Sequence, residues 1–335
     1  MTGEGGGPAD HRPFRPVPGP PIRWAEAFGT RFIVFVDCEE EFDWYAPLDR
    51  VHRATTAMSA FPEAHRRFAE RGVALTCMAD FPIATDPLSV DILKQVIADG
   101  RSVVGAQLHG WVNPPHDEVV SGFTSFTGNL PRDLEAAKIA TLTAAIERSF
   151  GARPQVFRAG RYGLGPNSWA LLQEQGYRLS SSARARYDYR AQGGPDYRAV
   201  GSEAWREGDL IELPLTTVFI GVGRRGGAGL YDFAGKVRRG RGVLSRLGLQ
   251  KRVALTPEDM PVAEALEAVE VAAGEGLRLL TLSFHSPSLV PGHTPYVRDA
   301  ADLRTFWCWW DLVLNRLDRL GVTPASMADI LAAAR

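Results

Sequence analysis

One pattern repeats through most of this sequence: a short run of apolar, often β-branched residues followed by a longer segment with helical periodicity. Such runs are typical of strands buried on both faces, as in parallel sheets covered by helices. We predict strands at 31–37, 73–79, 102–109, 155–160, 177–182, 210–215 and 277–285, with helices at 54–71, 87–99, 131–149, 166–175, 257–273 and 300–320. About seven βα steps form either an open doubly wound sheet or a closed barrel, and both keep functional residues at the C-terminal ends of the strands.

Charge and cysteine content exclude several classes of protein. The chain has 335 residues, with 38 Lys and Arg against 39 Asp and Glu, so it lacks the basic excess of a nucleic-acid-binding protein. No stretch is apolar enough for a secretory signal or an integral membrane segment, and we expect neither. The three cysteines, Cys38, Cys77 and Cys308, show no CxxC spacing. They offer neither a disulfide framework nor a thiolate zinc site, which favours a reducing, cytoplasmic compartment.

Three segments fall outside the repeating pattern. Residues 1–22 are rich in Pro and Gly and are predicted to form a disordered or draped tail, which leaves a single domain over 23–335. Residues 183–206 and 220–252 interrupt that domain as insertions or lids. The segment 220–252, here called the basic insertion, holds nine Lys or Arg and one acid, Asp232. It is either a solvated, mobile loop or a segment whose arginines approach an anionic substrate or cofactor.

Two carboxylates follow the first predicted strand directly. Alternate side chains of an extended segment share a face, so Asp37 and Glu39 point the same way and Cys38 points the opposite way. Like charges held this close are tolerated best beside a cation, which predicts a divalent metal together with a general base. The next acids, Glu40, Glu41 and Asp43, fit a solvated acidic loop.

Other strands end in residues that complete such a site. His109 ends the strand 102–109, and imidazole is a good zinc ligand. Asn113, four residues on, and His116 are competing further ligands. Arg158 lies in a buried strand and needs a carboxylate partner, for which Asp37 is the candidate.

The last predicted strand ends at His285, which suits a general acid because the pKa of histidine lies close to working pH. Two serines nearby, Ser286 and Ser288, raise the possibility of a serine hydrolase. The chain has no GxSxG elbow, so we set that possibility aside. The strand-end residues together predict metal-assisted hydrolysis.

Five sequence blocks, in order, resemble the successive motifs of the polysaccharide deacetylase family (NodB homology, carbohydrate esterase 4), in its divergent WalW-like branch. The blocks are VDCEEEFDW (36–44), AQLHGWVNPP (106–115), VFRAGRYGLG (156–165), ELPLTT (212–217) and SFHSPSLVPGHTPYV (283–297). The resemblance spans roughly residues 30–330. It implies a distorted (β/α)7-type barrel, an α/β fold, with a divalent cation, usually Zn²⁺, at the C-terminal face.

The resemblance also implies roles for individual residues. Asp37 corresponds to the catalytic base, Glu39 to the metal carboxylate and His109 to a metal histidine. Arg158 corresponds to the residue that holds the base, and His285 to the catalytic acid. The family's second motif usually carries two histidines four apart, whereas here the fourth residue after His109 is Asn113, and Gln107 stands upstream. Gln107, Asn113 and His116 therefore all stay candidates for the third ligand.

The resemblance implies a metal-dependent hydrolase that removes N-acetyl, or O-acetyl, groups from a saccharide or a cell-envelope glycan precursor. Trp44, Trp111 and Tyr162 follow strands and either stack on the sugar or pack the barrel end. An acetylated saccharide is then the expected partner. The alternative is a barrel that binds saccharides without hydrolysis because its metal ligands have changed.

Overall fold

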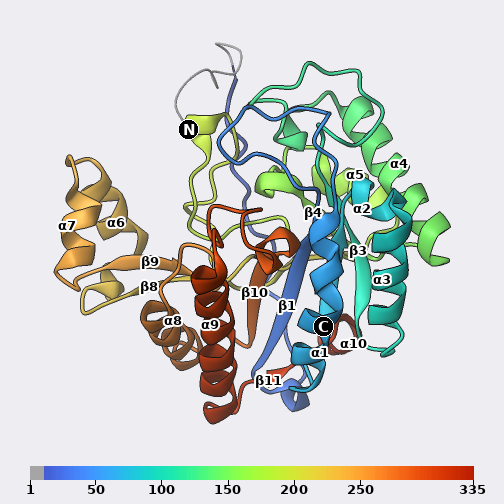
Figure 1. The fold of residues 1–335 in the computed structure, drawn as a ribbon. Coiled ribbons are helices and arrows are strands. Elements are labelled where there is room, and N and C mark those ends of the chain that lie inside the picture. Colours follow the sequence, from blue (N-terminus) through green and yellow to red (C-terminus); the bar gives the residue numbers. More distant parts are fainter. Residues whose placement is uncertain (1–10) are drawn as a thin grey trace.

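The computed structural model describes residues 11–335 and contains a barrel-like sheet surrounded by helices (Figure 1). Seven parallel strands form its wall in the order β10-β1-β2-β3-β4-β5-β7. Their bounds are β1 (Arg31–Cys38), β2 (Leu75–Ala79), β3 (Val103–Leu108), β4 (Val156–Ala159), β5 (Leu179–Ser180), β7 (Leu210–Glu212) and β10 (Leu279–His285). The predicted α/β fold, a distorted (β/α)7-type barrel, is confirmed.

Short strands extend the sheet, and backbone hydrogen bonds link its two ends. β6 (Trp205–Glu207) pairs antiparallel with β7, and β11 (Thr323–Pro324) pairs with the start of β1. After β7, the chain passes beside β10, where the Thr216 amide donates to the Thr281 carbonyl over 3.2 Å. The Ser283 amide donates to Leu255, also over 3.2 Å. These bonds join the two ends of the curled sheet.

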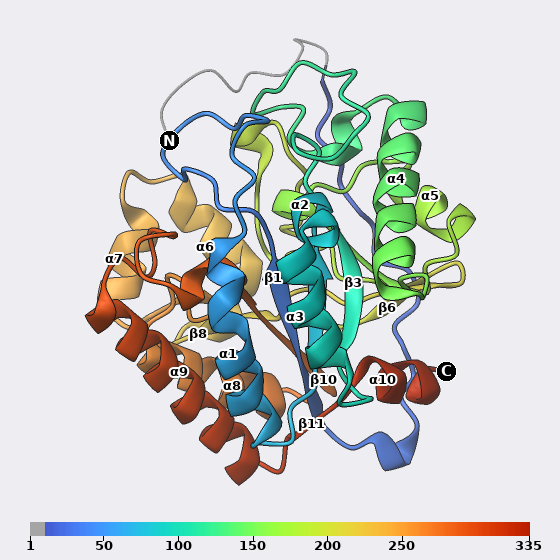
Figure 2. The same ribbon diagram turned by 45° about the vertical axis from the view of Figure 1, so that its right-hand side comes forward.

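Ten helices occur in residues 11–335, and most of them cover the outside of the sheet (Figure 2). Their bounds are α1 (Phe61–Ala69), α2 (Phe81–Thr85), α3 (Pro87–Ile97), α4 (Arg132–Phe150), α5 (Ser168–Glu174), α6 (Gly227–Gly235), α7 (Gly240–Arg246), α8 (Val262–Gly274), α9 (Ala300–Arg319) and α10 (Met327–Ala333). The bounds of α4 have local causes. Pro131 precedes the first turn, and Gly151 ends the helix at a φ of 74°, which favours glycine. None of these helices is long and apolar enough to cross a bilayer.

Strand alternation divides the side chains of β1 between two cores. Val34, Val36 and Cys38 pack outward in the core that includes residues of α1, α8 and α9. Ile33 and Phe35 belong to the separate core that also holds Met78, Val156 and Leu179 from neighbouring strands. Asp37 follows Ile33 and Phe35 at the same parity, so it lies on the inner face at the strand's C-terminal end. The register then sets Asp37 beside His285, and Gln107 beside Arg158.

The largest departure from prediction is the basic insertion. Instead of a loop, it forms an antiparallel pair, β8 (Thr217–Ile220) and β9 (Lys251–Ala254), with α6 and α7 between them. In Figure 1 these two helices project beyond the barrel. Glycines at the turns, such as Gly221 with a φ of 91°, let the chain reverse here.

The predicted tail begins before the described residues. Its first ten residues lie outside them, and residues 11–22 run along the barrel. Phe14 accepts from the Asp196 amide over 2.8 Å, and the Ile22 amide donates to Ala204 over 2.9 Å. The division into a tail (1–22) and one domain (23–335) with insertions at 183–206 and 220–252 stays a prediction.

Candidate active site

A cavity of about 380 Å³ opens at the C-terminal ends of the strands. Its walls include eight of the residues singled out in the sequence: Asp37, Glu39, Trp44, His109, Trp111, Arg158, Tyr162 and His285. Gln107 also lines it, whereas Asn113 and His116 are not among the lining residues. The strand-end residues therefore surround one space.

Asp37 is held by Arg158, as the sequence predicts. Arg158 Nη1 donates to Asp37 Oδ1 over 2.6 Å and to Ser283 Oγ over 2.7 Å. The rest of the guanidinium donates to the carbonyl and hydroxyl oxygens of Ser181, and its face lies over the Phe35 ring at 4.7 Å. Both charges are almost fully buried, so each compensates for the cost of burying the other. Asp37 is thus an oriented carboxylate whose second oxygen faces the cavity.

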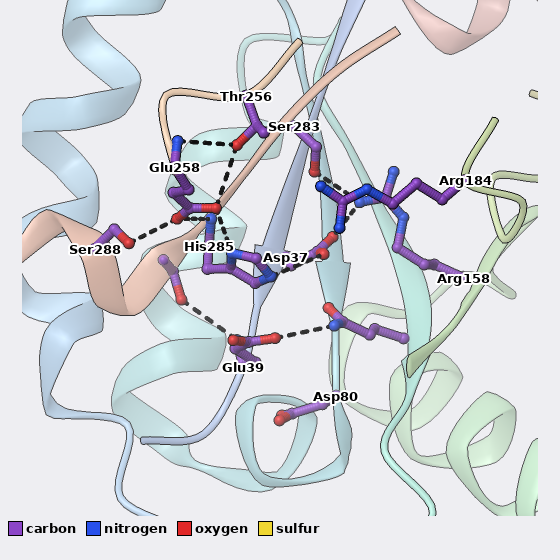
Figure 3. A network of polar contacts seen from close by, with 12 residues as sticks. Asp37, Glu39, Asp80, Arg158, Arg184, Thr256, Glu258, Ser283, His285 and Ser288 are labelled. Atoms are coloured by element: carbon purple, nitrogen blue, oxygen red, sulfur yellow. Dashed lines mark hydrogen bonds and ion pairs between the residues drawn. The ribbon is translucent and has the colours of Figure 1, made fainter. Parts of the chain in front are cut away.

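His285 stands between two carboxylates (Figure 3). Its Nδ1 donates to Glu258 Oε2 over 2.5 Å, and its Nε2 lies 3.7 Å from Asp37 Oδ2. Burial alone lowers the pKa of His285, but the charges of Glu258, Glu39 and Asp37 outweigh it and raise that pKa to about 10. For Glu258, burial raises the pKa of the carboxyl group. The charge of His285 and the hydrogen bonds from His285 and Ser288 outweigh burial, so the pKa of Glu258 lies below its ordinary value. The pair is therefore an imidazolium–carboxylate pair.

Glu39, Gln107 and His109 converge beside Asp37. The Gln107 amide nitrogen lies 3.0 Å from Glu39 Oε2 and 3.0 Å from His109 Nε2, and these last two atoms are 3.6 Å apart. Two buried oxygens, Glu39 Oε1 and Gln107 Oε1, have no hydrogen-bond partner in the described residues. A half turn of the Gln107 amide exchanges its nitrogen and oxygen. One carboxylate oxygen, one imidazole nitrogen and one amide oxygen then face a common point, which is a donor set suited to a divalent cation.

His109 is oriented by Glu40 and Trp111. His109 Nδ1 donates to Glu40 Oε2 over 2.7 Å, which leaves Nε2 as the acceptor that faces Gln107. Trp111 Nε1 donates to Glu40 Oε1 over 2.7 Å, and its ring stacks on His109 at 4.3 Å. A metal-ligating histidine generally makes such a hydrogen bond through its other nitrogen. The expectation that Glu40 is solvated is wrong, because its side chain is fully buried; Asp43 is exposed.

Burial shapes the charge of this cluster. It raises the pKa of Glu39 to about 7 and that of Glu40 to about 8. It also raises the pKa of Asp80, which caps α2 and accepts from the Glu40 amide over 2.8 Å. Several acids thus share a region with little solvent, and a bound cation there would offset their repulsion.

The structure does not bring Asn113 or His116 to this group. The Asn113 amide donates to the carbonyls of Pro114 and Lys138, over 2.6 and 3.0 Å, inside the loop that follows β3. The ring of His116 lies 3.1 Å from an Arg53 guanidinium nitrogen. Of the candidates for the third ligand, Gln107 is the one beside Glu39 and His109.

The aromatic residues divide between rim and wall. Trp44 meets His285 edge to face at 5.5 Å and Tyr296 at 5.4 Å. Trp111 is 2% exposed and its ring stacks on His109, so little of the ring surface is open to a ligand. Tyr162 lies under Arg158 and Arg184, whose guanidinium carbons are 5.8 and 5.5 Å from its ring centre.

Sequence reasoning missed Glu258, Glu40 and Arg184. Glu258 lies in the segment between β9 and α8, and only the fold brings it to His285. Arg184 lines the cavity with tyrosine partners and has no carboxylate within 4.0 Å in residues 11–335. For Arg184, the arginine- and tyrosine-rich composition of 183–206 was the one sequence feature that could have indicated a functional role. For Glu258, no sequence feature indicated such a role.

No sequence model of a known family matches this chain, and no curated protein sequence does. Among solved structures, it is similar to the 4-alpha-glucanotransferase from Thermococcus litoralis, with a TM-score of 0.52 and 11% identity over 92% of this chain and 41% of that one. A Mycobacterium smegmatis protein assigned as a polysaccharide deacetylase gives a TM-score of 0.49 at 16% identity, over 93% and 98% of the two chains. The chitin deacetylase from Colletotrichum lindemuthianum gives 0.42 at 10%, over 95% of both. The likeness to the glucanotransferase shows a shared fold, and the reaction has to be inferred from the site.

Proposed function

We propose that the chain is a metal-dependent hydrolase that removes N-acetyl, or O-acetyl, groups from a saccharide or a cell-envelope glycan precursor. The observation that carries the proposal is the meeting of a held carboxylate, Asp37, and a charged histidine, His285, beside the Glu39–Gln107–His109 group. The five ordered sequence blocks, which resemble polysaccharide deacetylases, support the same chemistry.

Glu39, Gln107 and His109 would hold the divalent ion, with Zn²⁺ the first choice for this mixture of oxygen and nitrogen donors. The two unpartnered oxygens, Glu39 Oε1 and Gln107 Oε1, support this assignment because buried polar atoms generally have partners. When bound, such an ion polarises an acetyl carbonyl and makes a water molecule more acidic.

The protein's own groups supply the proton transfers. Asp37, held by Arg158, accepts a proton from the water that attacks the acetyl carbon. His285, charged through Glu258, donates a proton to the leaving nitrogen as the carbon–nitrogen bond breaks. The products are acetate and a free amine. Trp44 and Tyr162 offer aromatic faces for the sugar ring.

The thiols support a cytoplasmic compartment as part of the proposal. Cys38 and Cys77 are buried and Cys308 is exposed, all of them free. An exposed free thiol favours a reducing, cytoplasmic compartment. The substrate there would be a soluble or lipid-linked precursor, and nucleic acid is not an expected partner of this site.

Acetate release tests the proposal. Zinc-loaded protein is incubated with N-acetylated and O-acetylated saccharides, and we expect release by the parent chain and none above background by Asp37→Asn or Glu39→Ala. Asp91→Asn, an exposed acid on α3, is the matched control and should keep full activity. No release from any saccharide by the parent chain, with Glu39→Ala indistinguishable from it, rejects hydrolysis; saccharide binding without release then supports the non-catalytic alternative.

A further inference from the structure

The basic insertion carries a concentration of charge that the active site does not use. Its nine Lys or Arg against one Asp give it a formal charge of +8, whereas the whole chain has −1. Asp232 is already placed between Arg198 and Arg241, at 3.6 and 3.7 Å. Six of the nine cations have no carboxylate within 4.0 Å in residues 11–335, and five of these six are exposed: Arg225, Lys236, Arg238, Arg239 and Arg246. These charges face solvent.

The same segment also exposes apolar side chains. Of the 13 exposed large hydrophobic residues in the described part of the chain, six lie within 222–249: Val222, Phe233, Val237, Val243, Leu247 and Leu249. Phe233 is 66% exposed and Leu247 is 65% exposed. A segment of less than a tenth of the chain thus holds nearly half of these residues. Exposed apolar groups gathered in this way indicate an interaction surface.

The position of the insertion links this surface to the cavity. α6 and α7 project from the barrel on the β8–β9 stem (Figure 1). At the base of the stem, the Arg252 guanidinium carbon lies 3.7 Å from the centre of the Tyr187 ring, and Tyr187 lines the cavity. β9 leads directly to Thr256 and Glu258 in the cavity wall.

We propose that the basic insertion docks on an anionic lipid surface, with its cations at the headgroups and Phe233, Val237 and Leu247 entering the interface. Exposed cations interspersed with apolar side chains on short helices have the composition of an interfacial anchor. An acidic protein surface would pair with the cations of the insertion but would leave its exposed apolar side chains in water. The phosphates of a nucleic acid would likewise pair with the cations and offer nothing to the apolar side chains. Docking would bring the cavity close to the membrane. The substrate would then be a lipid-linked saccharide, and this assignment of the substrate rests on the proposed function.

Vesicle sedimentation tests the docking without any turnover. The full chain is mixed with vesicles of phosphatidylcholine alone, or of phosphatidylcholine with phosphatidylglycerol, at low and at high NaCl. We expect binding to the anionic vesicles that weakens as salt screens the charges. The triple variant Lys236→Gln, Arg238→Gln and Arg239→Gln should lose roughly 100-fold in partitioning, since each Lys or Arg near the surface contributes several-fold.

Two further variants separate charge from apolar insertion. A control triple variant removes the same number of exposed cations from α3 and α9, through Lys94→Gln, Arg304→Gln and Arg319→Gln. Its partitioning should stay within about 3-fold of that of the parent chain. Phe233→Ser with Leu247→Ser should weaken binding at every salt concentration. The proposal is overturned if the parent chain ignores anionic vesicles, if both triple variants behave alike, or if duplex DNA is bound and vesicles are not. Acetate release from a soluble saccharide is measured in parallel, so that failure of docking and failure of hydrolysis are told apart.

Discussion

Two glutamate–histidine pairs lie at the same cavity, each with its histidine in the lining, and differ in charge and surroundings. The His285–Glu258 pair has a histidine side chain that is 23% exposed and a raised pKa at His285, whereas in the His109–Glu40 pair both side chains are buried and the pKa of Glu40 is raised by burial. In each pair, Nδ1 faces the glutamate and Nε2 faces the cavity group. In the proposed function, the same two kinds of side chain therefore act as a proton donor at His285 and as a lone-pair donor at His109.

The neighbours of Nε2 explain the difference. His285 Nε2 lies near the Asp37 carboxylate, which favours the charged imidazolium. His109 Nδ1 donates to Glu40, so its Nε2 keeps a lone pair that faces the Gln107 side-chain amide 3.0 Å away. The nitrogen of that amide donates to this lone pair, and after the half turn that a cation site requires, the amide oxygen would share the cation with it. A carboxylate at Nδ1 alone does not decide the role of a histidine; the group opposite Nε2 does.

The largest expected effect separates the two histidines. We expect His109→Ala to lose the bound divalent ion and with it all acetate release. His285→Ala should keep the ion and lose about 10²- to 10⁴-fold in kcat, the usual contribution of a general acid. Ion content per chain and kcat are measured together, with thermal unfolding as the check on folding. Equal ion content in the two variants would contradict the division of roles.

Glu258→Gln tests the charged pair through pH. The carboxylate of Glu258 raises the pKa of His285, so its loss lowers that pKa toward the ordinary value near 6.5. A general acid must be protonated, and activity falls as pH rises through its pKa. The variant should therefore lose activity at a lower pH than the parent chain, with a deficit of roughly 10²-fold at pH 9 and a smaller one at pH 6. Profiles of kcat/KM with the same alkaline limb in both chains would remove Glu258 from this role.

These residues differ in how far the sequence foretold them. Asp37 and Glu39 followed from strand alternation, and the sheet register brought His285 and Arg158 to them, because a parallel barrel collects all strand ends on one side. Glu40 looked like part of a solvated acidic run. It is buried because its amide binds Asp80 and its carboxylate binds His109, contacts between elements that a single sequence does not record.

The positions of the loop side chains after β3 were harder to predict, because they also depend on contacts between elements. A turn follows His109, in which the backbone amide of Asn113 donates to the His109 carbonyl over 3.1 Å. The Asn113 side chain nevertheless turns to the Lys138 carbonyl on α4, because a buried amide must find a partner wherever the fold provides one. The basic insertion differs in another way: a loop or lid was expected there, while the β8–β9 pairing gives it a stem.

Glu40→Gln tests the buried pair. The amide oxygen can still accept from His109 Nδ1, but the amide nitrogen cannot accept from Trp111, so one of two orienting bonds is lost. We expect a 10- to 100-fold loss of metal affinity, with kcat at saturating ion close to that of the parent chain. Competition with a coloured chelator gives the affinity. A loss of kcat without a loss of affinity would assign Glu40 to proton transfer instead.

The smallest effect compares the two tryptophans beside the histidines. Trp111→Phe keeps a ring against His109 but removes the donor to Glu40, and leaves that buried carboxyl oxygen with one partner fewer; the cost in free energy of unfolding should be about 1–3 kcal/mol. Trp44→Phe keeps the edge-to-face contact with His285, and the Trp44 ring nitrogen donates no hydrogen bond within residues 11–335, so the cost should stay within about 0.5 kcal/mol. Urea unfolding of both variants measures the difference. Equal costs would mean that the Trp111–Glu40 hydrogen bond adds nothing to the stability of the buried pair, and His109 would then be oriented by Glu40 alone.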